Sequence, residues 1–254
     1  MTARFASLLL AIGLTGALAA MPAAAADPGA MTLAAAVENA SRPAPQRARD
    51  RYRHPLETLR FFGIRQDMTV VEIWPGGQGG YYRRILEPYL VAEGHYVPVQ
   101  QSGPFPDTVP GVPYGAVDMV LVFRAHGFTI YDRPPQAYID AIHAMLKPGG
   151  VFGIVDHKGN EAVPQAEKGD NGYVNESFVI GMAEKAGFRL EAGSDVNRNP
   201  RDRKDHPRGV YSLPPTLAGT LPFTEAREHF LAIGESDRFT LRFGKPAEEV
   251  DTPP

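Results

Sequence analysis

The sequence contains no cysteine, which excludes disulfide bridges and a lipid-anchored N-terminal cysteine, so the fold must be stabilised by packing. After the first 26 residues there is no repeat of fixed period and no low-complexity tract, which excludes repeat architectures. The formal net charge of −3 is unlike that of a basic nucleic-acid-binding domain. We therefore predict a globular protein with no nucleic-acid partner.

The N-terminus has the three parts of a secretory signal peptide. Arg4 is followed by an apolar run from Phe5 to Met21 and by Ala24-Ala25-Ala26, which predicts cleavage before Asp27. An uncleaved membrane anchor is the alternative, because the apolar run is nearly long enough to span a bilayer. We predict a periplasmic or secreted protein with no stable membrane insertion after cleavage. Removal of Arg4 would change the net charge to −4.

The residues after the predicted cleavage site indicate one domain with polar extensions. The length of residues 27–254 suits one large domain or two small ones, and the lack of a Ser/Gly-rich linker favours one. We predict an N-terminal arm over 27–54, an α/β domain over 55–246 and a disordered tail over 247–254. A proline-rich insertion over 197–223 belongs to the α/β domain. The sequence gives no indication of the oligomeric state.

Short apolar runs alternate with amphipathic helical patterns, which predicts a doubly wound, mostly parallel α/β sheet. Pro98 favours an edge position for the second strand, whereas the strongly apolar third strand should be central. Ligands of such sheets bind at the carboxyl ends of the strands. The predicted strands are 68–74, 95–100, 117–123, 151–159, 189–196 and 238–246. The predicted helices are 31–40, 55–63, 81–94, 134–150, 174–188 and 224–235.

Four glycines follow the first predicted strand and precede a helix. Gly76, Gly77, Gly79 and Gly80 allow backbone N–H groups to approach a ligand, and the helix N-terminus adds a partial positive charge that suits a carboxylate or phosphate. The alternative is a turn that requires positive φ, which would explain one or two of the glycines. Trp74 precedes this loop and could either stack on a ligand or belong to the core.

Polar side chains cluster where strands end. Arg124 and His126 follow the third strand, Asp156 and His157 follow the apolar run of the fourth strand, which ends at Val155, and His206 lies in the proline-rich insertion. An acid beside a histidine can orient it as a proton acceptor, so these five residues are candidate catalytic residues. The alternative is that they are solvated loop residues. The three histidines and Asp156 could also bind a metal ion, but no short spacing between histidines supports this, and we predict no metal site.

The predicted arm carries arginine at alternate positions, namely Arg47, Arg49, Arg51 and Arg53. Guanidinium groups bind carboxylates and phosphates through paired hydrogen bonds, so these residues could recognise an anionic substrate or cover the glycine loop. A solvated arm is the alternative, since runs of charge are usually exposed.

A set of segments spanning nearly the whole chain after the signal peptide carries a family resemblance: 49–63, 68–77, 117–124, 145–158, 173–190, 199–217 and 231–241. With these segments the sequence resembles class I S-adenosylmethionine-dependent methyltransferases, and among them a group of exported predicted methyltransferases. The glycine loop and the LKPGG turn are general to that fold. The segments RYRHP and KDHPRGVYSLPP resemble the exported group specifically.

The resemblance implies a Rossmann-like fold and methyl transfer from S-adenosyl-L-methionine to a nucleophilic nitrogen, oxygen or carbon of a small-molecule substrate. It implies that Glu72 holds the glycine loop or the methionine amine of the cofactor. The cofactor-binding residues implied in this way are Glu72, Trp74, Gly76, Gly77, Gly79, Gly80 and Gln100. The candidate catalytic residues remain Arg124, His126, Asp156, His157 and His206.

The chain departs from the family pattern after its second strand. Gln100 and Gln101 stand where the fold usually has an acid for the ribose hydroxyls, and residues 101–116 are too few for the usual helix, strand and helix. The region between the second and fourth strands of the family fold is therefore shortened. These departures favour an alternative, a catalytically inactive small-molecule-binding or accessory protein on the same scaffold. An exported hydrolase that uses the Asp and His residues is a third hypothesis.

Overall fold

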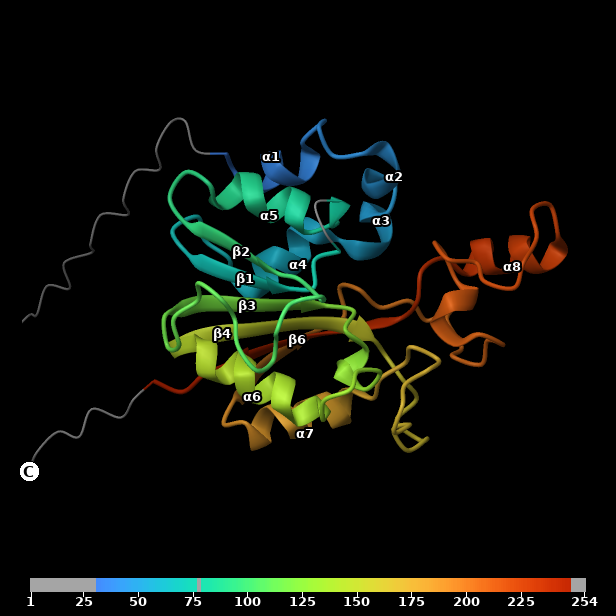
Figure 1. Ribbon diagram of the computed structural model, residues 1–254. Coiled ribbons are helices and arrows are strands. Elements are labelled where there is room, and N and C mark those ends of the chain that lie inside the picture. The colour runs from blue at the N-terminus through green and yellow to red at the C-terminus, as the bar shows by residue number, and fades with distance from the viewer. Residues whose placement is uncertain (1–30, 77–78, 248–254) are drawn as a thin grey trace, which may run out of the picture. The chain divides into compact units, whose positions relative to one another are not determined.

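The computed structural model describes residues 31–76 and 79–247 and contains a six-stranded sheet between two helical layers (Figure 1). The predicted signal peptide over 1–26, Gly77 and residues 248–254 of the predicted tail lie outside the described residues. The strands are β1 (Thr69–Ile73), β2 (His95–Val99), β3 (Val117–Phe123), β4 (Leu146–His157), β5 (Arg189–Ser194) and β6 (Arg238–Gly244). All six lie where the apolar runs predict them.

The sheet is mostly parallel, with the strand order β2-β1-β3-β4-β6-β5. Strands β2, β1, β3 and β4 pair in parallel, and β6 runs antiparallel to both of its neighbours. The strand with Pro98 is at one edge and β3 is central, as predicted. The last strand, β6, lies between β4 and β5. This placement depends on long-range pairing, and the sequence of β6 does not indicate it.

Helices cover both faces of the sheet (Figure 1). On one face lie α1 (Leu33–Glu38), α4 (Pro55–Phe62) and α5 (Arg83–Leu90), and on the other lie α6 (Pro135–Met145) and α7 (Glu176–Lys185). Each layer buries its apolar stripe, such as Leu59 and Phe62 in α4 and Ile139 and Ile142 in α6. This burial is the main stabilising contribution, at about 25 cal/mol per Å² of apolar surface.

Glycine and proline set some of the predicted helix boundaries, but the helix predicted over 81–94 ends at Leu90, before Gly94, and a second prediction also fails. Pro55 begins α4, and Gly63 ends it with a left-handed φ of 78°. The helix predicted over 134–150 is shorter than expected. In the structure α6 ends at Met145, and residues 146–150 begin β4. Proline disfavours helical backbone in the residue before it, so Pro148 prevents the helix from continuing.

The arginine-rich segment before α4 is folded onto the domain, although the side chains of Arg47 and Arg51 are exposed. It forms two short helices, α2 (Ala44–Arg47) and α3 (Asp50–Arg53). The side chains of Arg42 and Arg53 are almost completely buried, at 1% and 3% exposure. Arg42 forms a bidentate ion pair with Asp50, with both distances 2.8 Å. The solvated alternative is thus wrong for Arg53, which lies among other charged groups.

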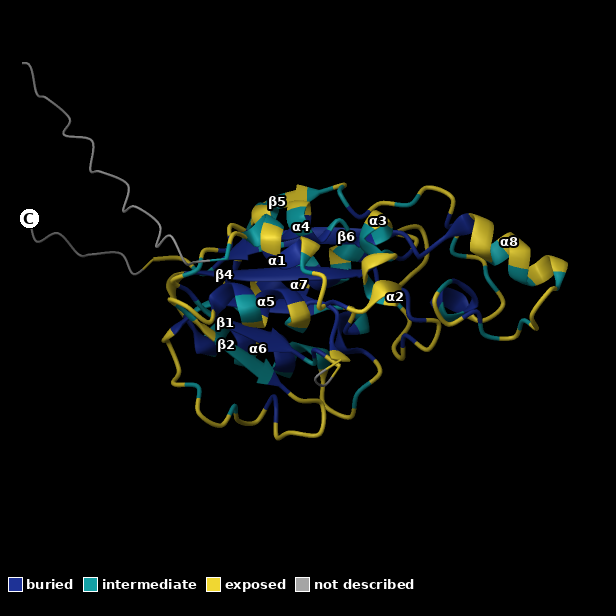
Figure 2. Cartoon of the chain, turned by 90° about the horizontal axis from the view of Figure 1, so that it is seen from above, coloured by how far each residue is buried: buried dark blue, intermediate teal, exposed yellow. Residues whose placement is uncertain are grey.

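The proline-rich segment 197–223 contains only a short 3-10 helix, η3 (Gly209–Ser212), and leads to α8 (Glu225–Ile233). Helix α8 lies away from the sheet, and most of its residues are exposed (Figure 2). In the described part of the chain, no helix combines the length and hydrophobicity needed to cross a bilayer.

Candidate active site

The backbone is strained where β1 and β3 end. Trp74, Arg124 and His126 all have left-handed φ angles, of 54°, 62° and 49°. Such a conformation costs a non-glycine residue of the order of 1–3 kcal/mol and is concentrated at functional sites. Sheet pairing continues up to the strained positions, since the N–H of Trp74 donates to Val99 and that of Arg124 to Val155, both at 2.8 Å. The strain therefore lies at the edge of the sheet where ligands of this architecture bind.

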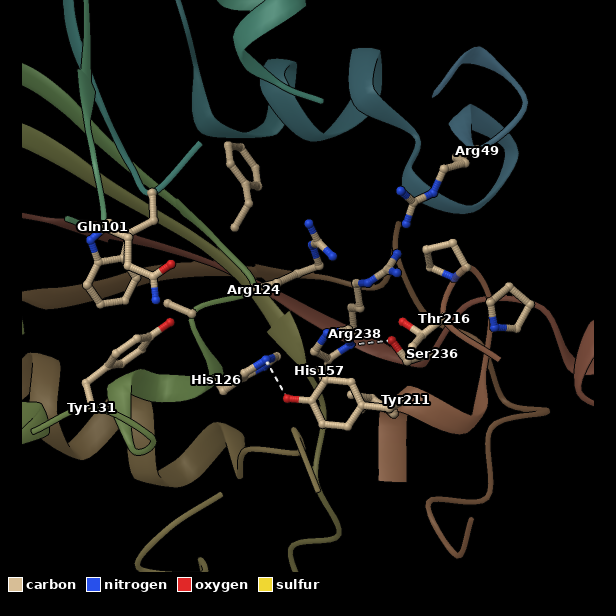
Figure 3. Close-up of a pocket in the computed structure, with 16 residues that line it drawn as sticks. Arg49, Gln101, Arg124, His126, Tyr131, His157, Tyr211, Thr216, Ser236 and Arg238 are labelled. Atoms are coloured by element: carbon tan, nitrogen blue, oxygen red, sulfur yellow. Dashed lines mark hydrogen bonds between the residues drawn. The ribbon is translucent and has the colours of Figure 1, made fainter. Parts of the chain in front are cut away.

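A cavity of about 200 Å³ opens at this edge (Figure 3). Its walls come from the ends of β3, β4 and β6, from the arginine-rich segment and from residues 210–216 of the proline-rich segment. The polar side chains that line it are Arg49, Gln101, Arg124, His126, Tyr131, His157, Tyr211, Thr216, Ser236 and Arg238. The structure thus brings together four of the five candidate catalytic residues, since Asp156 lies directly behind His126.

The fifth candidate, His206, lies elsewhere. Its Nε2 atom is 2.9 Å from a carboxylate oxygen of Asp202, and its ring packs edge-on against Phe230. It does not line the cavity described above. The structure gives His206 a place in the packing of the proline-rich segment, apart from the cavity at His126.

His126 and His157 line the cavity, and the buried carboxylate of Asp156 lies behind His126. The Nδ1 atom of His126 is 3.6 Å from Asp156, an ion-pair distance that is too long for a hydrogen bond. Asp156 is fully buried and accepts hydrogen bonds from the backbone N–H groups of Gly127 and His157, at 2.9 and 2.8 Å. Tyr211 contacts Nε2 of His126 at 3.4 Å. This arrangement places His126 as a proton acceptor with a carboxylate behind it.

His157 has a different role because it is held uncharged. Burial, followed by the positive charge of Arg238, lowers the pKa of His157 well below its ordinary value of 6.5. Its Nδ1 atom is hydrogen-bonded to the hydroxyl of Ser236. The ring also stacks on that of His126, with centroids 5.2 Å apart. A neutral imidazole in this position supports the neighbouring ring and presents no charge to a ligand.

Arginine side chains surround the other side of the cavity and share one buried carboxylate. Glu235 is ion-paired with Arg49, Arg53 and Arg238, with a distance of 3.1 Å to Arg53. Burial alone would raise the pKa of Glu235, but these three guanidinium groups lower it to about 2. Arg124 is different, since it has no hydrogen-bonded or ion-paired side-chain partner within the described residues. We call Arg49, Arg53, Arg124 and Arg238 the arginine cluster.

A second cavity, of about 520 Å³, lies beside the glycine loop and shares Trp74 and Gln101 with the first. It is also lined by Gly76, Gln100 and Ser102. Gly76 has a φ of 82°, which any other residue would adopt only with strain. Gly79 accepts a hydrogen bond from Gln46 of α2 at 2.5 Å, and Gly80 is buried. Of the seven predicted cofactor residues, Trp74, Gly76 and Gln100 line this opening, whereas Glu72, Gly79 and Gly80 do not and Gly77 lies outside the described residues.

Trp74 separates the two cavities. Its left-handed backbone turns the indole away from the face that strand alternation would give it, so that it packs in the same core cluster as Ile73. The ring lies 4.2 Å from that of Tyr131 and 5.3 Å from that of Phe128, between centroids. Its Nε1–H is buried and unpaired within the described residues. Of the two alternatives from the sequence, core packing accounts for most of the ring.

Glu72 lies on the opposite face of β1 from the cluster around Trp74. It is 2% exposed and accepts a hydrogen bond from the hydroxyl of Tyr96 at 2.6 Å. Burial raises the pKa of Glu72 to about 7, although Tyr96 and Arg83 act in the opposite direction. The carboxyl group is therefore close to half-ionised at neutral pH.

The raised pKa of Glu72 predicts a specific pH dependence of stability. Its proton is bound more tightly in the folded than in the unfolded protein, so the folded state loses stability as the pH rises from about 4.5 to about 7. Glu72→Gln removes this loss. As the pH is raised from 5 to 8, the free energy of unfolding of the variant should increase by about 2–3 kcal/mol relative to that of the parent. Urea unfolding at both pH values measures this, and an equal difference at both would contradict it.

Several residues of the site were not singled out from the sequence, including Tyr131, Tyr211, Glu235, Ser236 and Arg238. Tyr211 and the Glu235–Arg238 stretch lie within segments 199–217 and 231–241, which carry the family resemblance. That resemblance is the one signal that could have drawn attention to them. Their chemistry depends on partners far apart in the chain, as in the pairing of Arg53 with Glu235.

Comparisons with known proteins bear on the fold. No protein-family model matches this chain, and no curated protein matches it. Among solved structures, a SAM-dependent methyltransferase from Aquifex aeolicus matches over 78% of this chain and 93% of its own, with 14% identity and a TM-score of 0.51. The chain has the Rossmann-like methyltransferase fold. At this level of identity the likeness establishes the architecture alone, because one fold can carry many activities.

Two further similar structures have lower scores. The [4+2]-cyclase SpnF matches over 77% of this chain and 81% of its own, with 15% identity and a TM-score of 0.49. The geranyl diphosphate C-methyltransferase of Streptomyces coelicolor A3(2), in complex with Mg²⁺, geranyl diphosphate and S-adenosyl-L-homocysteine, matches over 76% of this chain and 77% of its own, with 13% identity and a TM-score of 0.47.

Proposed function

We propose that the protein is an S-adenosylmethionine-dependent methyltransferase of the exported compartment that acts on a small molecule. The observation that supports this most directly is the pair of adjoining cavities at the carboxyl ends of β1 and β3, which share Trp74 and Gln101. One cavity lies beside the glycine loop and would hold the cofactor. The other contains His126 and the arginine cluster and would hold the methyl acceptor. The exported location rests on the N-terminal sequence.

The residues beside the glycine loop fit the cofactor. The cavity of about 520 Å³ is within the roughly 300–1,000 Å³ of small-molecule sites. Gly76 leaves the backbone free of a side chain where a ligand would approach. Gln100 and Gln101 offer amide donors and acceptors that suit ribose hydroxyls without adding charge. Glu72, behind β1, would support the loop through the strand rather than by direct contact, given its bond to Tyr96.

The chemistry requires little of the protein beyond alignment. The bound cofactor supplies a methyl group on a positively charged sulfur, which is already a good leaving group. His126 would accept the proton that the acceptor nucleophile loses, through Nε2, which faces Tyr211. Asp156, 3.6 Å from Nδ1, would stabilise the imidazolium that forms. Trp74 and Tyr131 would exclude water between the two cavities.

Isothermal titration calorimetry with S-adenosylmethionine and S-adenosylhomocysteine tests the proposal, together with a variant of the glycine loop. Gly76→Ala places a methyl group on a backbone with φ of 82°, and we expect it to weaken S-adenosylhomocysteine binding at least tenfold. The strain itself should cost about 1 kcal/mol of stability. Gly149→Ala is the matched control, because Gly149 has a φ of 75° and an open environment near the start of β4.

The control variant should lose similar stability and keep the affinity of the parent protein. Absence of binding at millimolar concentrations of both ligands would reject the methyltransferase proposal. Equal weakening by both glycine substitutions would show that the loop has no special part in binding.

A binding protein without methyl transfer is the second candidate. The observation that favours it is the aromatic packing of Trp74 against Phe128 and Tyr131 at the loop, together with Gln100 in place of an acid. Such a protein would bind a ligand in the cavity at His126 but would bind no S-adenosylhomocysteine in the calorimetric experiment.

A further inference from the structure

Three members of the arginine cluster line one side of the cavity at His126, and no acid does so within the described residues (Figure 3). Arg49 comes from the segment before α3, Arg124 from the end of β3 and Arg238 from the start of β6. Three segments that are distant in sequence thus direct guanidinium groups to the same space. This arrangement concentrates positive charge on one wall of a small cavity.

The positive charge is only partly compensated. Glu235 is the shared partner of Arg49, Arg53 and Arg238, so one carboxylate faces three guanidinium groups. Arg124 adds a fourth without a side-chain partner among the described residues. The Nη2 groups of Arg49 and Arg53 are buried and form no hydrogen bond within the described residues. Buried donors without partners are costly, and the cluster as a whole has more donors than acceptors.

Arg124 is the member best placed to contact a ligand. Its side chain is exposed and projects into the cavity rather than into packed core (Figure 3). Burial lowers the pKa of Arg124, and repulsion from Arg238 and Arg49 lowers it further. Burial, followed by repulsion from Arg124 and Arg238, likewise lowers the pKa of Arg53. The free protein therefore keeps mutually repelling charges close together at a strained position.

A metal ion is the competing occupant. His126, Asp156 and His157 offer ligand atoms within 4.8 Å of one another, a spacing that could hold a cation. The carboxylate of Asp156 already accepts two backbone hydrogen bonds. A divalent cation there would also face the excess positive charge of the arginine cluster, and Coulomb repulsion at low dielectric opposes this strongly. The charge of the cavity thus favours an anion.

We propose that the cavity binds a small organic anion through a carboxylate or phosphate group held by Arg124 together with Arg49 and Arg238. That this anion is the methyl acceptor rests on the proposed function. Guanidinium groups suit both oxyanions, because their N–H groups form paired hydrogen bonds with two oxygens. A cavity of about 200 Å³ is smaller than the sites of drug-sized ligands, so the ligand is a small molecule. Held in this way, its nucleophile would lie against His126.

The test is calorimetric titration of the protein with inorganic phosphate and, separately, with malonate. Arg124→Asn is the informative variant, because asparagine tolerates left-handed backbone and removes the charge. We expect saturable binding of at least one anion by the parent protein and at least tenfold weaker binding by the variant. Arg65→Gln, an exposed arginine paired with Asp67, is the control and should bind as the parent does.

A thermal unfolding measurement separates binding from a structural role. Because Arg124 is repelled by its neighbours, Arg124→Asn should raise the melting temperature of the free protein while reducing the stabilisation by added anion. A purely structural arginine would show the opposite, a lower melting temperature. The relative effect of phosphate and malonate identifies which oxyanion the site prefers.

Each remaining outcome decides the proposal. Absence of saturable binding of both anions, with and without S-adenosylhomocysteine, would overturn it. Competition between the anion and S-adenosylhomocysteine would also overturn it, because the arginines would then hold the cofactor. Anion binding that requires a divalent cation and disappears with EDTA would place a metal in the site and overturn it. Anion binding without any binding of S-adenosylhomocysteine would support the anion site and reject the proposed methyl transfer.

Discussion

Replacing Glu235 by glutamine is expected to lower the free energy of unfolding by about 3–5 kcal/mol at pH 7. The substitution removes the only charge that compensates Arg53 and Arg238 in the ion pairs described, and both side chains are almost completely buried. Charges left unpaired in the interior cannot recover the hydration that they lost on folding. Urea unfolding of the parent and the variant at pH 7 measures the effect.

The effect of Glu235 should depend on pH in a defined direction. Its pKa is lowered from 4.5 to about 2, so its contribution is fully present above pH 4.5 and is lost as the pH falls through about 2. This shift corresponds to about 3 kcal/mol. The difference between Glu235→Gln and the parent protein should therefore shrink as the pH is lowered from 5 toward 2.

A surface carboxylate provides the control for this experiment. Glu191 lies 3.4 Å from Arg242, and both side chains are partly exposed. Exposed ion pairs contribute about 0–1 kcal/mol, so Glu191→Gln should change stability by no more than that. If the two substitutions destabilised the protein equally, the buried ion-pair network would not be the main determinant at Glu235.

Replacing His126 by asparagine is expected to lower kcat for methyl transfer by about 10²–10⁴-fold. Asparagine tolerates the left-handed backbone at this position, so the fold should be retained. The variant cannot accept the proton that leaves the nucleophile, whereas the cofactor cavity is lined by other residues. We therefore expect the dissociation constant of S-adenosylhomocysteine to remain within threefold of that of the parent.

Formation of S-adenosylhomocysteine, with hydroxy- or amino-substituted carboxylates and phosphates offered as acceptors, measures this prediction. His95→Asn is the control, since His95 is exposed at the start of β2 and far along the strand from the ligand edge. An unchanged kcat in His126→Asn would remove the histidine from the mechanism and leave Arg124 and the cavity as a binding site.

The elements of the fold follow from local sequence patterns. Buried parallel strands are short apolar runs, so 117–123 could be recognised and placed at the centre. Pro98 lacks a backbone N–H, which limits its strand to an edge, and Gly63 provides the left-handed residue that ends α4. These signals are local because each depends on the conformation of one residue or the periodicity of a few.

The composition of the site depended on tertiary structure. The sequence indicated His126, Asp156 and His157 as a group, because the ends of parallel strands meet at one edge of a sheet. It did not indicate that Arg53 is buried, since the compensating Glu235 is 182 residues away. It also did not indicate that His206 lies apart from the other histidines.

The sequence by itself thus determined the succession of strands and helices along the chain and the edge of the sheet at which the candidate site lies. Only the tertiary structure decided which charges face the cavity, how they are compensated and where Trp74 directs its ring. The physical reason is that apolar periodicity is a property of neighbouring residues, whereas electrostatic energy depends on distances between groups that folding brings together from separate parts of the chain.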